Sequence, residues 1–146
     1  WQDLDGDGPN APVLTNASAT LSPNTAYDLS VQLLNETEAA NLNDPEYNIT
    51  LEIEEEDEAH LFLYDVTAGL FASFIYNDSD STLPLGLETT LTTGNGTPAT
   101  GTLTVVLLHE SDKSATGVSL GGPVRPSNAG VGGETDVQAD FTINVQ

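Results

Sequence analysis

Apolar and polar side chains alternate along much of this chain, with the two-residue period typical of β-strands. The alternation predicts strands over residues 27–34, 47–54 and 136–145, and shorter apolar runs predict others over 60–66, 70–76 and 87–93. Residues 101–109 are apolar on both faces, so we expect them to form a central strand. Only residues 54–63 have a pattern that a helix would also explain.

Gly, Pro and Asn separate these segments, with 13 Gly and 8 Pro in the chain. Several strands at such spacing predict an all-β fold, an antiparallel β-sandwich of the immunoglobulin-like or jelly-roll-like kind with about seven or eight strands. The Gly-rich residues 111–135 are expected to form a long loop. No repeat or linker divides the chain, so residues 1–146 are expected to form a single domain.

The charge is strongly negative, because 23 acidic groups face two cations, a formal net charge of −21. Nucleic acid and anionic membranes are therefore not expected as partners. The apolar runs are too short for a transmembrane segment. Without cysteine the chain has no disulfide, thiolate metal site or cysteine nucleophile. Bound cations and adaptation to high salt both remain explanations of the acidity.

A calcium-binding pattern opens the chain. Asp3, Asp5 and Asp7 occupy alternate positions before a glycine, as in the first half of a calcium loop, and Asn10 could add a ligand. The twelfth position is Leu14, where an EF-hand has a bidentate Glu. Ca²⁺ bound with further ligands from elsewhere, or a plain acidic turn, are the two interpretations.

Two other acidic segments follow. Residues 52–58 hold six carboxylates just before His60. They form either a solvated edge or loop that discourages strand-to-strand aggregation, or a cation-collecting surface with His60 as a ligand. Residues 77–81 predict an Asx-type turn or a second calcium loop.

The only two histidines are His60 and His109, and Glu110 follows the second. The predicted strand 101–109 places His109 at the rim of the core, where a histidine is commonly a structural group. If strands 60–66 and 101–109 are neighbours, His60, His109 and Glu110 could form an N₂O site for zinc or copper.

Catalytic signatures are weak. The chain has no Gly-x-Ser-x-Gly elbow, and the glycines of residues 130–133 are not followed by a helical pattern. We therefore do not expect an enzyme.

Glycosylation motifs and the first residue bear on location. Five Asn-x-Ser/Thr sequons and an Asp-Ser-Thr triplet, which looks like a short O-glycosylation signal, provide the candidate sites Asn16, Asn35, Asn48, Asn77, Asn95 and Ser81. They favour a secreted, surface-displayed protein. The chain starts at Trp1 rather than Met, so we expect a processed or incompletely represented N-terminus.

Motifs spread over nearly the whole chain carry a family resemblance. They lie in residues 3–13, which begin Asp3-Leu4-Asp5-Gly6-Asp7-Gly8, and in residues 33–38, 52–60, 101–113, 128–130 and 133–136. The combination resembles a family of small secreted or lipid-anchored Bacteroidota proteins often labelled "type 1 periplasmic binding fold". That label denotes an α/β fold, whereas the alternation here predicts an all-β one. The resemblance implies export to the cell surface or periplasm and no established activity.

Members of that family typically have one more strand before the position of Trp1. A sandwich without an edge strand exposes backbone groups that a neighbouring chain can pair by strand addition, which builds a head-to-tail fibre. We therefore expect an exported, Ca²⁺-stabilised structural or assembly subunit that self-associates. The alternative is a ligand- or metal-capture lipoprotein that feeds an outer-membrane transporter.

Overall fold

The computed structural model describes residues 2, 13–78, 84–115 and 130–146. The elements in these residues are β1 (Ser18–Leu21), β2 (Ala26–Ser30), α1 (Thr50–Glu55), β3 (His60–Val66), β4 (Phe71–Tyr76), β5 (Glu88–Thr93), β6 (Thr100–His109) and β7 (Glu134–Val145). Among the described residues, no helix has the length and apolar character needed to cross a membrane.

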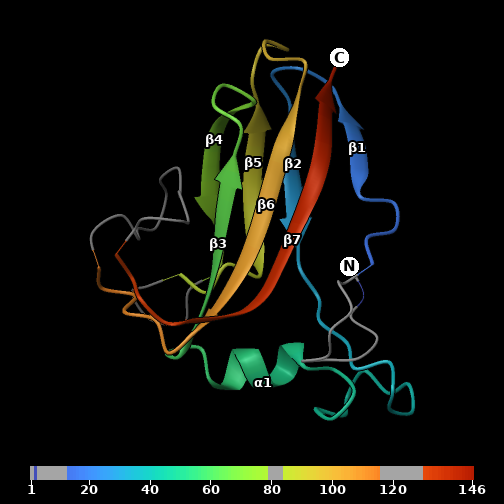
Figure 1. Cartoon of the computed structure of the whole chain (residues 1–146), viewed down its shortest axis with the longest axis vertical. Coiled ribbons are helices and arrows are strands. Elements are labelled where there is room, and N and C mark those ends of the chain that lie inside the picture. Colours follow the sequence, from blue (N-terminus) through green and yellow to red (C-terminus); the bar gives the residue numbers. More distant parts are fainter. Residues whose placement is uncertain (1, 3–12, 79–83, 116–129) are drawn as a thin grey trace.

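The strands form two sheets, with the orders β1-β7-β6-β3 and β2-β5-β4. The sheets face each other and α1 lies at one end of them (Figure 1). The predicted all-β sandwich is confirmed. The order β2-β5-β4 corresponds to strands B, E and D of an immunoglobulin-type sandwich, and the order β7-β6-β3 corresponds to its strands G, F and C. All pairs are antiparallel except β1 and β7, which run parallel from Ser18↔Thr142 to Leu21↔Val145.

The predicted alternation of exposed and less exposed positions is clear in β2 and β7. In β7 the five apolar positions that alternate along residues 137–145 are all buried or half-buried, and Asn144 is the one polar position that is also half-buried. Strand β6 lies between β7 and β3, so the prediction of a central strand over residues 101–109 is confirmed.

Residues 47–54 do not form the predicted strand, because residues 50–54 belong to α1 instead. The N–H of Ile53 donates to the carbonyl of Ile49, and the side chain of Ile53 is buried in the core. Positions four apart share a face in a strand and also in a helix, so Ile49 and Ile53 fit both patterns. The glutamates Glu52, Glu54 and Glu55 are good helix formers that remain exposed on the opposite face.

The bounds of the other elements lie closer to those predicted from the sequence. Strand β2 ends at Ser30 rather than continuing to residue 34, and β1 was not predicted because its four residues are short and mostly exposed. The expected loop over residues 111–135 ends at Glu134, where β7 begins. Its described parts, 111–115 and 130–133, contain no strand or helix and meet where the N–H of Asp112 donates to the carbonyl of Val131.

Aromatic side chains of β3 and β4 fill the core near the centre of the sandwich. The ring of Tyr64 packs on Phe74 with centroids 4.7 Å apart, and Tyr76 meets both edge-on. The Tyr64 hydroxyl donates to the Gly86 carbonyl, and the Tyr76 hydroxyl donates to the Phe62 carbonyl at 2.6 Å. Burial raises the pKa of both tyrosines far above its usual value.

Candidate metal site

Two histidines lie directly opposite each other at one end of the larger sheet. His60 begins β3, His109 ends β6, and the register pairs them. Their imidazole rings are stacked, with centroids 4.7 Å apart and planes 6° from parallel. The two predicted strands are therefore neighbours, and this brings together two of the three side chains that the sequence suggested as ligands.

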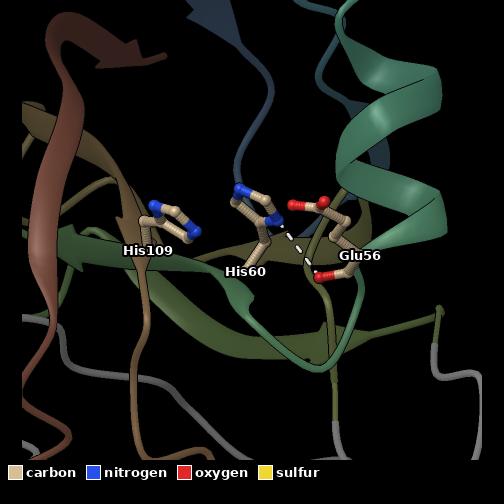
Figure 2. A group of neighbouring side chains, drawn as sticks. All are labelled: Glu56, His60 and His109. Carbon is tan, nitrogen blue, oxygen red and sulfur yellow. Dashed lines mark hydrogen bonds between the residues drawn. The ribbon is translucent and has the colours of Figure 1, made fainter.

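Glu56 completes a cluster with the histidines. Its carboxylate and the imidazole nitrogens of His60 and His109 each offer one ligand atom, and these atoms lie within 4.8 Å of one another. Figure 2 shows the ring of His60 between His109 and Glu56. The cluster thus combines two nitrogen donors with one oxygen donor from three elements.

The local backbone explains how Glu56 reaches this position. Glu56 is the residue that caps the C-terminus of α1, and its N–H donates to the carbonyl of Glu52. The chain then turns, with the Ala59 N–H donating to the Glu56 carbonyl at 2.9 Å. His60 follows at once as the first residue of β3, so the turn places residues 56 and 60 side by side.

The same carbonyl orients the ring of His60. His60 Nδ1 lies 3.1 Å from the Glu56 carbonyl oxygen (Figure 2). A carbonyl can only accept, so Nδ1 is the donor of this contact, and in the neutral ring Nε2 is then the nitrogen with a lone pair for a metal. Metal-binding histidines commonly donate their second nitrogen to such an acceptor, which holds the ring in place.

The burial of the three side chains forms a gradient. His60 is 7% exposed, His109 is half-buried, and Glu56 is exposed. The cluster therefore runs from the rim of the core to the surface.

Ring stacking has a consequence for coordination. The lone pair of an imidazole nitrogen lies in the ring plane, and two parallel, separated planes share no point where one ion could sit in both. One ring must turn for both to bind the same ion. His60 is held by Glu56, whereas His109 is less buried and its terminal torsion has a broad energy minimum, so His109 is the ring that a shared ion would require to turn.

Glu110, which the sequence suggested as the third ligand, is not in the cluster. It is exposed and has a left-handed backbone, with φ of 54°. From the sequence, Glu56 was expected only as one of six carboxylates in residues 52–58. The signal that could have singled it out is its place four residues before His60, at the end of an unrecognised helix.

Lys113 supports the turn that carries Glu56. It is 6% exposed, and its ammonium donates to the Asp57 carbonyl at 2.6 Å. Burial lowers the pKa of Lys113, and the charges of Asp57, Asp78 and Glu58 partly oppose that shift. Lys113 follows β6 by four residues, so it connects the segment carrying His109 with the turn carrying Glu56 and His60.

The remaining predicted sites have separate outcomes. The candidate calcium ligands Asp3, Asp5, Asp7 and Asn10, and the candidate O-glycosylation site Ser81, lie outside the described residues. In the segment 77–81, predicted as an Asx-type turn or a second calcium loop, the carboxylate of Asp78 accepts the N–H groups of Gly86 and Glu88 at 2.8 and 3.0 Å. This carboxylate therefore links the chain just after β4 to the start of β5.

The sequons differ in access. Asn16, Asn77 and Asn95 are exposed and Asn35 is half-buried. Asn48 is buried, and its Nδ2, where a glycan would attach, donates to the Leu42 carbonyl at 2.9 Å. A glycan on Asn48 is therefore incompatible with this packing.

Comparison of the chain with protein-family models, with curated proteins and with solved structures finds no match. Among the described residues, the cluster of Glu56, His60 and His109 is the feature whose chemistry indicates a function.

Proposed function

We propose that this protein binds a divalent transition-metal ion through the carboxylate of Glu56 and the imidazoles of His60 and His109. The observation that carries the proposal is the convergence of these three ligand atoms within 4.8 Å. Two imidazoles and one carboxylate suit Zn²⁺ and Cu²⁺, whereas Ca²⁺ prefers a shell of six to eight oxygens.

Metal binding would also stabilise the fold. The three ligands come from the end of α1, the start of β3 and the end of β6. An ion bound to all three holds the short helix against the sheet, and its binding free energy adds to the free energy of unfolding. The net charge of −21 supports the proposal, because such a surface raises the local concentration of cations. The biological role that we propose is metal capture by an exported, non-enzymatic module.

The test is a titration of Zn²⁺ and, separately, Cu²⁺ into the metal-free protein, followed by calorimetry. We expect one ion per chain, an affinity loss of at least about 100-fold in His109→Ala, and a loss of at least about tenfold in Glu56→Gln. Glu110→Gln is the matched control, since it removes the same charge next to His109 but outside the cluster. Equal affinity in the wild type and in the His60→Ala, His109→Ala double variant would contradict the proposal.

A second candidate function, assembly by strand addition, is favoured by the edge strand β4. Among the described residues β4 pairs only with β5, it contains no charged residue, and Ile75 is 40% exposed. Exposed edge strands normally carry charges that prevent pairing with other chains. The absence of charge here is notable in so acidic a protein.

Sedimentation and electron microscopy of the wild type test this candidate, which predicts oligomers or fibres. Ile75→Lys should abolish them, while Gln138→Lys, at an exposed position of β7, should not. Chelation of Ca²⁺ should weaken the assembly if the ion stabilises the subunit through Asp3, Asp5 and Asp7. A wild-type protein that stays monomeric at all concentrations contradicts this function.

A further inference from the structure

The cluster provides fewer ligands than a closed metal site requires. Structural zinc sites have four protein ligands, while sites with two histidines and one glutamate leave a position for an external ligand. Among the described residues, Glu56, His60 and His109 are joined by no fourth His, Asp or Glu. His60 Nδ1 is hydrogen-bonded to the Glu56 carbonyl, so His60 offers a metal only Nε2.

The open position faces solvent. The buried member, His60, lies at the core side, and the exposed member, Glu56, lies at the surface side. A fourth ligand therefore approaches past Glu56, and a water molecule there can exchange with other donors.

The charges around this approach are mostly negative. Six carboxylates lie within two residues of a ligand or belong to one: Glu54, Glu55, Glu56, Asp57, Glu58 and Glu110. Lys113, the one Lys or Arg among the described residues, is buried against the Asp57 carbonyl. A divalent ion and Lys113 together do not neutralise six carboxylates. The local field therefore repels an incoming anion and leaves a neutral donor unaffected.

We infer that the metal bound by Glu56, His60 and His109 keeps one exchangeable coordination position, and that this position takes a neutral nitrogen donor, such as an imidazole, in preference to an anion. This inference rests on the proposed function. The class of ligand that it names is an imidazole or amine, free or on a peptide, and Cu²⁺ and Zn²⁺ both accept such donors.

The experiment uses the full chain loaded with one equivalent of Cu²⁺, whose electron paramagnetic resonance and visible spectra report its ligands. Imidazole and azide are titrated separately at low ionic strength, and dialysis confirms that copper stays bound. We expect imidazole to change both spectra with saturation, at a concentration at least about tenfold below that required for azide. Raising the salt from about 10 mM to about 150 mM should strengthen azide binding and leave imidazole binding unchanged.

A variant with fewer carboxylates distinguishes the effect of the local electric field on ligand binding from the effect of the coordination chemistry. The triple variant Glu55→Gln, Glu58→Gln, Glu110→Gln removes three carboxylates and no ligand, so azide should bind more tightly and imidazole as before. Spectra that neither compound changes, with copper bound, mean that the site is closed and overturn the inference. Equal binding of azide and imidazole in the wild type overturns the charge preference. A wild type that does not bind Cu²⁺ at all overturns the proposed function, and this inference with it.

Discussion

The ring of His60 is stacked on the ring of His109, with centroids 4.7 Å apart and planes within 6° of parallel. This cross-strand pair joins the first residue of β3 to the last residue of β6. Because a shared ion requires one ring to turn, the metal-free and metal-bound proteins should differ in the orientation of His109. The pair is therefore a packing contact and, in the proposed metal site, a source of two ligands, and substitutions can separate the two roles.

The His60→Ala and His109→Ala variants should differ in stability without metal. His60 is buried and bonded to Glu56, so its loss should lower the free energy of unfolding by about 2 kcal/mol. His109 is half-buried, and its loss should cost less than about 1 kcal/mol. Urea unfolding in EDTA measures both. Adding Zn²⁺ at about 100 times its dissociation constant should stabilise the wild type by about 2.7 kcal/mol and neither variant by a comparable amount. Equal losses in EDTA would contradict the assigned burial roles.

Gly86→Ala should destabilise the protein strongly. Gly86 has φ of +94°, and an added Cβ would lie 2.7 Å from Tyr76 and 2.8 Å from Phe62. The expected cost is more than about 3 kcal/mol, from the left-handed backbone and overpacking together. Gly132→Ala is the control, since Gly132 has φ of +60° with nothing near its Cβ position and should lose only about 1 kcal/mol. Equal losses in thermal unfolding would show that the packing around residue 86 can relax.

Stability should fall steeply in alkaline solution. Burial raises the pKa of Tyr64 and Tyr76 above the usual 10.0, so above pH 10.0 the unfolded chain loses these protons while the folded protein keeps them. The stability is fully present below pH 10.0 and decreases above it by about 1.4 kcal/mol per pH unit for each tyrosine. Urea unfolding between pH 9 and 11 measures the slope, and Tyr76→Phe should reduce it by about half. An unchanged slope in that variant would assign the loss to other groups.

Lys113 should have the opposite pH dependence. Burial lowers its pKa in the folded protein below the usual 10.5, so between the two values the unfolded chain holds a proton that the folded protein lacks. Stability from this group therefore rises with pH through that window, by at most about 1.4 kcal/mol per pH unit. Comparison with Lys113→Met cancels the tyrosine contribution, and the wild type should gain relative to the variant as pH approaches 10.5. A constant difference would mean that the ammonium stays charged throughout.

The strands that could be predicted from the sequence are those whose two faces differ or are both apolar. Strand β3 has the predicted bounds and β6 the predicted central place, because burial dictates side-chain choice in a core. The helix α1 could not be predicted, because it has only 6 residues. The helical spacing of apolar residues is seen only in the pair Ile49 and Ile53, and that spacing also fits a strand. Strand β1 is short and exposed, so only its pairing with β7 defines it.

The cluster of Glu56, His60 and His109 was predictable only as far as the elements that carry these residues were. The sequence suggested that His60 and His109 meet if their strands are neighbours, and the register confirms that they meet. Glu56 required knowledge of the helix and of the turn that follows it, where one carbonyl accepts both a backbone and an imidazole proton. These contacts depend on how the helix, the turn and the strand pack together, which the alternation of apolar and polar residues does not specify.

The parallel pairing of β1 with β7 has a mechanical consequence. The Ala17 carbonyl accepts the Thr142 N–H and the Leu21 carbonyl accepts the Gln146 N–H, so bonds join the two strands along the length of β1. Tension between the segment before β1 and the segment after β7 pulls the two strands in opposite directions along their common axis. The bonds are then sheared together rather than opened in turn, and single-molecule stretching should record one high-force rupture. Leu21→Pro, which shortens β1, should lower that force.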